Sequence, residues 1–180
     1  MTVVYFIEGV ALRYFLLRQD KRFDKYASIS EPICVRRVWQ GDEPFNSAYK
    51  AQKPQGYIHF LPLLEEPVFM VTEEVKKVFN TYQSQIDYIP FGLGDQNIRN
   101  PKIYYLVQPP EIDCLSSEVE FCEANCVKKI ILDKKKIRHN NVFRIKGARK
   151  NNLVASMIIV EALLSERINE FEFIELECKE

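Results

Sequence analysis

Few residues in this sequence are placed to do covalent chemistry. The chain has only two histidines, and a Ser–His or Cys–His mechanism needs an imidazole beside its nucleophile. His139 stands in a turn rich in Lys and Arg, where we expect it to be solvated. His59 stands between Ile58 and Phe60, which is typical of a half-buried histidine in a strand. We therefore nominate no catalytic residue and expect that the protein is not an enzyme.

The closest approach to a metal site is Cys122-x-x-x-Cys126, with Cys114 nearby. Structural zinc takes four N or S ligands, usually from two closely spaced pairs, and a second pair is missing here. The sequence also lacks a P-loop, a dinucleotide fingerprint, a G-x-S-x-G elbow and an H-E-x-x-H motif. We expect neither a metal nor a cofactor. The odd set of cysteines indicates reduced thiols: Cys34, Cys114, Cys122, Cys126 and Cys178.

The composition is that of an ordinary folded protein. The 180 residues include 25 Lys or Arg and 25 Asp or Glu, so the formal net charge is zero, which argues against a body built to coat nucleic acid. The N-terminal stretch lacks the basic region and the cleavage site of a signal peptide. No uncharged apolar run approaches the roughly 20 residues that a bilayer span needs. We expect a cytoplasmic protein without a membrane segment.

The apolar pattern predicts an α+β fold, with a mixed, mainly antiparallel sheet and a few short helices. Residues 8–26 fit either a short helix or a strand, and residues 41–56, with two Pro and two Gly, predict a long surface loop. We interpret 1–56 as N-terminal strands and a loop that belong to the same domain as the core at 57–180. Strands are predicted at 2–7, 33–40, 68–71, 86–91, 102–107, 127–132, 141–145 and 171–176.

The middle and the end of the chain share a strand–helix–strand pattern. Thr72 stands where an N-cap would, which predicts a helix over 73–82. A strand at 156–160 and a helix at 161–168, with Leu164 and Ile168 facing inward, repeat that order near the end. The match suggests a pseudo-repeat, and convergent βαβ patterning explains it equally well.

Charge is segregated along the chain despite overall neutrality. Residues 111–123 carry five acids and no base, residues 128–150 carry ten Lys or Arg against one Asp, and residues 161–180 carry seven Glu against two bases. Such blocks are commonly solvated faces of a sheet. A functional alternative is that the basic block, with a hairpin tip at 134–138, binds nucleic acid in a salt-dependent manner. The candidate residues for that role are Lys134, Lys135, Lys136 and Arg138.

Several short motifs follow one another between residues 57 and 177. They are Val71-Thr72, Asp87…Pro90, Tyr104-Tyr105-Leu106, Ile112-Asp113-Cys114-Leu115-Ser116, Ile130-Ile131-Leu132-Asp133 and Val142-Phe143-Arg144-Ile145. In this order they resemble a bacterial immunity-protein family, the one numbered eleven and formerly a domain of unknown function. Its pattern is a strand that leads into a helix, a "d-x-x-x-P" strand, a "yyll…iDclD/S" segment, "kivLd…ki…niFRi" and a final strand–helix–strand.

The resemblance implies a non-enzymatic inhibitor that is encoded beside a secreted toxin and neutralises the toxin domain by stoichiometric occlusion. If the toxin is a nuclease, its substrate groove is basic, and the acidic blocks become the candidate contact surfaces. The expected partner-binding residues are Glu111, Asp113, Glu118, Glu120, Glu123, Glu161, Glu166 and Glu172. A third alternative, an enzyme with an unrecognised site, would require a pocket that gathers Asp113, His59 and cysteines.

Overall fold

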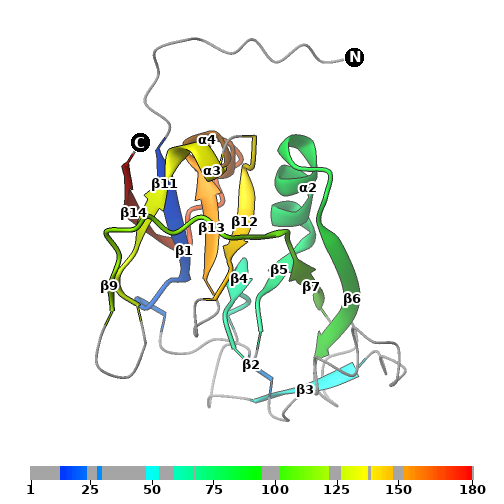
Figure 1. Ribbon diagram of the computed structural model, residues 1–180. Helices are drawn as coiled ribbons and strands as arrows, with labels where there is room; N and C mark the ends of the chain where they lie inside the picture. Colours follow the sequence, from blue (N-terminus) through cyan, green and yellow to red (C-terminus); the bar gives the residue numbers. More distant parts are fainter. Residues whose placement is uncertain are drawn as a thin grey trace.

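The computed structural model shows an α+β fold in which two six-stranded sheets share a pair of helices (Figure 1). The structure describes residues 13–23, 28–29, 48–52, 59–66, 68–94, 102–121, 127–137, 139–147 and 152–179. The fold class predicted from the sequence is therefore confirmed, although the division into two sheets was not foreseen. The strands predicted at 2–7 and 33–40 lie outside the described residues.

The first sheet is mixed and curves into a half-barrel. The segment 110–116 bonds to both of its edges: Arg144 N donates to Pro110 O at 2.9 Å, and Asp133 N donates to Cys114 O at 2.9 Å. In spatial order the strands are β11 (Ile131–Asp133), β14 (Phe171–Lys179), β1 (Tyr14–Gln19), β13 (Leu153–Ser156), β12 (Val142–Ile145) and β8 (Glu111–Ile112).

The second sheet is antiparallel apart from the parallel pairing of β3 with β6. In spatial order its strands are β2 (Ser28–Ile29), β3 (Ala48–Gln52), β6 (Asp87–Gly94), β7 (Lys102–Gln108), β5 (Met70–Thr72) and β4 (Leu63–Leu64). A separate antiparallel ribbon joins β9 (Glu120–Phe121) to β10 (Val127–Lys129). The described helices are α2 (Glu73–Tyr82), α3 (Lys134–Ile137) and α4 (Met157–Ser165).

Each sheet contains the same split strand–helix–strand unit. Strands β5 and β6 are joined through α2, and both pair antiparallel with β7, which lies between them. Strands β13 and β14 are joined through α4, and both pair antiparallel with β1. The pseudo-repeat is therefore present in the architecture. The central strand of the second unit comes from the N-terminal part of the chain, which thus contributes to the core of the domain.

The predicted boundaries of the second unit were wrong by about one helical turn. Ser156 is the N-cap residue of α4, and the residues predicted as the strand's end form the first turn of the helix. Ile159 and Leu163 are buried, whereas Leu164, predicted to face inward, is 48% exposed. The run from 157 to 164 is apolar almost throughout, so its pattern does not separate a strand from a helix.

Two further predictions also need correction. The loop predicted at 41–56 contains β3, which pairs with β2 and β6. Residues 134–137 of the predicted hairpin tip form the short helix α3 instead, and Arg138 lies outside the described residues. The flanking strands do not pair with each other, because β11 pairs with β14 while β12 pairs with β13 and β8. Both errors arise because Pro, Gly and Lys signal a turn locally, while the strand partners lie far away in sequence.

The largest core lies where both sheets meet α2 and α4. Helix α2 contributes Val75, Val78 and Phe79, and α4 contributes Ile159 and Leu163. Strands of both sheets complete this core with side chains such as Leu17, Val71, Val107, Val142, Leu153 and Phe171. The half-barrel has its own interior core, and the far side of the second sheet forms a third. Burial of this apolar surface is the main force that holds the two units together.

Two polar joints connect the units at their ends. At one joint Asn141 Nδ2 donates to Tyr82 O at 2.9 Å, its backbone N donates to Gln83 Oε1 at 3.0 Å, and Ser156 Oγ donates to Asn141 Oδ1 at 2.8 Å. This network ties the end of α2 to the start of α4. The other joint lies between β1 and the end of β4, where Arg18 Nη1 donates to Glu65 Oε2 at 3.1 Å.

Candidate functional site

The acids of the block 111–123 do not gather on one element. Glu111 lies in β8, Asp113 lies in the segment that closes the half-barrel, and both side chains are exposed. Glu118 lies in the turn that follows and forms an ion pair with Lys179 of β14. The described positions therefore follow the segment that runs from β8, at one edge of the half-barrel, toward β11 at the other. The side chain of Glu120 and the whole of Glu123 lie outside the described residues.

Most acids of β14 are matched by cations of the same chain. Both nitrogens of the Arg13 fork donate to the Glu175 carboxylate, at 2.6 and 2.7 Å, and this hydrogen bonding holds the pKa of Glu175 below its ordinary value. Hydrogen bonding from Lys129 likewise lowers the pKa of Glu177. The block 161–180 is thus largely neutralised along β14, by the pairs Glu172–Lys21 at 3.6 Å, Glu175–Arg13 at 2.6 Å and Glu177–Lys129 at 2.6 Å.

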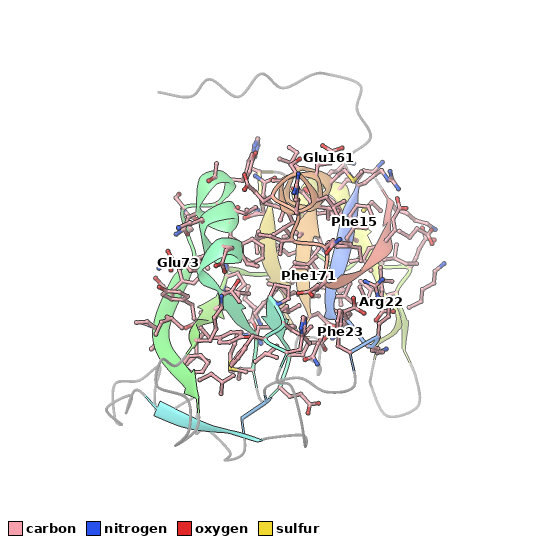
Figure 2. The ribbon with its side chains drawn as sticks, turned by 180° about the vertical axis from the view of Figure 1, so that it is seen from behind. Phe15, Arg22, Phe23, Glu73, Glu161 and Phe171 are labelled. Carbon is pink, nitrogen blue, oxygen red and sulfur yellow. The ribbon has the colours of Figure 1, made fainter. Side chains whose placement is uncertain are left out.

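Helix α4 carries the two nominated acids that remain. Glu161 lies on its outer side, at the periphery of the molecule in Figure 2, and Glu166 follows its last turn; both are exposed. Within the described part of the chain neither forms an ion pair. Ile158 and Leu164 flank Glu161, one turn away on either side, and are 43% and 48% exposed. An exposed acid between two exposed apolar side chains is suited to contact with another protein.

The sequence interpretation missed Ile158 and Leu164. It placed the helix one turn too late, and this turned Leu164 toward the core. The signal that could have found them is Ser156, a favoured N-cap residue directly before the apolar run. A helix that begins after Ser156 has Ile159 and Leu163 inward and therefore Ile158 and Leu164 outward.

The residues of the basic alternative lie on α3, between β11 and β12. Lys135 and Lys136 are exposed, and Lys134 is half-buried. Lys136 Nζ donates to the backbone oxygen of Leu115 at 3.1 Å, so part of its hydrogen-bonding capacity serves the closure of the half-barrel. Arg138 lies outside the described residues.

His59 is half-buried, as predicted, and has a partner that the sequence did not reveal. Its Nε2 lies 2.8 Å from Glu170 Oε1, in the segment before β14, and its ring stacks on Phe23 with centroids 4.5 Å apart. A histidine–carboxylate pair can activate a nucleophile that lies beside it. The described thiols lie elsewhere, because Cys114 and Cys178 both belong to the core inside the half-barrel. The pair therefore links the segment before β4, in the second sheet, to the segment before β14, in the first sheet.

Burial makes the described thiols weak nucleophiles. Cys114 is fully buried, and burial raises the pKa of its thiol to about 12. Burial also raises the pKa of the half-buried Cys178. No three His, Cys, Asp or Glu side chains among the described residues are grouped so that they could hold a metal ion. Cys34, Cys122 and Cys126 lie outside the described residues.

In the part of the chain that the structure describes, no helix has the length and apolar character required to cross a bilayer. A scan against models of protein families finds no match for the chain, and neither does a search of curated proteins.

Proposed function

We propose that this protein is an immunity protein that binds a secreted bacterial toxin domain and neutralises it by covering the toxin's working surface. It acts in the cytoplasm of the producing cell, in one-to-one stoichiometry and without covalent chemistry of its own. The proposal rests on the sequence resemblance described above. One structural observation supports it: the residues that carry the resemblance are neighbours in the fold.

The observation is that the separate sequence motifs are paired with one another in space. In the second sheet, Thr72 pairs with Tyr104, and Pro90 pairs with Tyr105. In the half-barrel, Ile112 pairs with Ile145, and Leu115 forms a bridge with Leu132. Motifs that are far apart in the sequence thus constrain each other's packing. The motifs therefore form two groups of paired segments, one in each sheet.

Co-expression tests the proposal directly. The proposal places a large secreted protein with a toxic C-terminal domain beside this gene, and that domain is induced in a heterologous bacterium, with or without the 180-residue chain. We expect growth arrest by the toxin domain alone and recovery with the chain present, together with a one-to-one complex on size-exclusion chromatography. Growth arrest that persists at full expression of the folded chain contradicts the proposal, as does protection without a complex.

A further inference from the structure

The outer faces of α2 and α4 occupy equivalent places in the two split units. Thr72 and Ser156 are the N-cap residues, so positions of the two helices correspond when they are counted from these caps. The same four positions are exposed in both helices. In α2 these are Glu74, Lys77, Asn80 and Thr81, and in α4 they are Ile158, Glu161, Leu164 and Ser165.

This equivalence shows that the fold itself does not require apolar residues on the outside of α4. At these four positions α2 is wholly polar, and its exposed apolar side chain, Tyr82, stands at the last residue of the helix, whereas α4 leaves Ile158 and Leu164 about half exposed to water. Single exposed apolar side chains are common on protein surfaces, whereas apolar side chains that gather on one face mark an interaction site. The difference between two matched helices therefore points to an interaction and not to stability.

The two helices also differ in whether their acids form ion pairs within the chain. The acids at the start of α2 pair within the chain: Glu73 with Lys76 at 3.8 Å, and Glu74 with Lys102 at 3.6 Å. Glu161 and Glu166 have no such cation among the described residues. A partner that covers α4 with acidic residues of its own would leave these carboxylates desolvated and repelled, whereas a basic partner would compensate them.

We propose that the outer face of α4, defined by Ile158, Glu161, Leu164 and Glu166, docks a basic protein surface that has apolar side chains at its centre. The identification of that partner as the toxin domain rests on the proposed function. The two apolar side chains supply the buried centre of the contact, and the two carboxylates supply steering and register. The acids of β14 stay paired with their own cations and lie outside this contact.

The test compares α4 variants with α2 variants at equivalent positions. The probe is the purified toxin domain encoded by the adjacent gene, titrated calorimetrically into the full chain. Ile158→Glu, Leu164→Glu and Glu161→Lys are the α4 variants. Asn80→Glu, which matches Leu164, and Lys77→Glu, which matches Glu161, are the controls. All of these positions are exposed, so the urea midpoint of each variant should stay close to that of the parent protein.

We expect each α4 variant to raise Kd at least about tenfold, and Glu161→Lys also to flatten the dependence of Kd on salt, while the α2 controls bind like the parent. Unchanged binding by the α4 variants overturns the inference but leaves the proposed function intact. If the parent chain neither binds nor protects, the proposed function itself fails.

Two other occupants would also be revealed. A parent protein that dimerises in sedimentation experiments, and becomes monomeric on Ile158→Glu, would assign the face to a second copy and overturn the proposal. A large fall in the urea midpoint of Ile158→Glu, with toxin binding retained, would assign it to another segment of the same chain and overturn it equally.

Discussion

We expect the hydrogen bonds around Asn141 to stabilise the protein by holding the two strand–helix–strand units together. Asn141→Ala removes the hydrogen bond to Tyr82 O at 2.9 Å and the acceptor of the Ser156 hydroxyl at 2.8 Å. A hydrogen bond contributes about 0.5–1.5 kcal/mol, and a buried group left unsatisfied costs about 1–3 kcal/mol. Ser156 is only 3% exposed, so its hydroxyl has little access to water when the acceptor is lost. We expect a loss of about 2–3 kcal/mol in the free energy of unfolding.

That loss corresponds to a fall in Tm of about 5–10 °C, because a domain of this size loses about 2–4 °C per kcal/mol. Urea unfolding followed by circular dichroism measures it. Asn80→Ala, on the exposed side of α2, is the matched control and should stay within about 0.5 kcal/mol of the parent.

A double-mutant cycle tests whether the stability that is lost comes from the hydrogen bond between Asn141 and Ser156 or from replacing an asparagine in general. Because Asn141 and Ser156 share one hydrogen bond, the combined variant Asn141→Ala/Ser156→Ala should lose about 1 kcal/mol less than the sum of the single variants. Strict additivity would show that the side chains of Asn141 and Ser156 act independently. An Asn141→Ala midpoint equal to that of Asn80→Ala would refute the view that Asn141 connects the two units.

Three further outcomes are expected. Leu163→Ala, at a fully buried position of α4, should lower the free energy of unfolding in urea by about 2–5 kcal/mol, whereas Leu164→Ala at the next, exposed position should lower it by under about 1 kcal/mol. Equal losses would show that the buried and exposed faces of α4 are misassigned. Burial raises the pKa of the Cys114 thiol to about 12, so Cys114 should resist iodoacetamide at neutral pH until urea unfolds the protein. Peptide mass spectrometry measures the labelling, and labelling of Cys114 in the native protein would contradict its place in the half-barrel core. The hydrogen bonds from Arg13 hold the pKa of Glu175 below its ordinary value of 4.5. The pair therefore stabilises the fold above pH 4.5 and loses its effect as the pH falls through the lowered pKa, so Glu175→Gln should reduce the urea midpoint more at pH 7 than at pH 3. A difference that does not depend on pH would contradict the pairing.

Part of the fold follows from local patterns that need no tertiary information. The helix 73–82 was predicted at its observed bounds, because Thr72 stands at the N-cap and Val75, Val78 and Phe79 recur with helical spacing. Strand β7 was predicted within one residue. These segments are amphipathic or strongly β-forming, so their periodicity already specifies the buried face.

The candidate site was predicted only in part. Charge blocks in the sequence singled out Glu161 and Glu166, yet they gave the same weight to acids such as Glu118 and Glu172. The structure separates the two groups, because cations from distant parts of the chain approach Glu118 and Glu172 and leave Glu161 and Glu166 exposed without them. A sequence block records charge but not the partners that neutralise it.

The sequence alone determined the α+β class, the helix after Thr72, the order of the late strands and the existence of a repeated strand–helix–strand pattern. Only the tertiary structure decided that β1 enters between β13 and β14, that the segment 110–116 closes the half-barrel and that α4 begins after Ser156. The physical reason is the same in each case. An apolar segment fits a helix or a strand about equally well by itself, and its choice depends on hydrogen-bond and packing partners that lie far away along the chain.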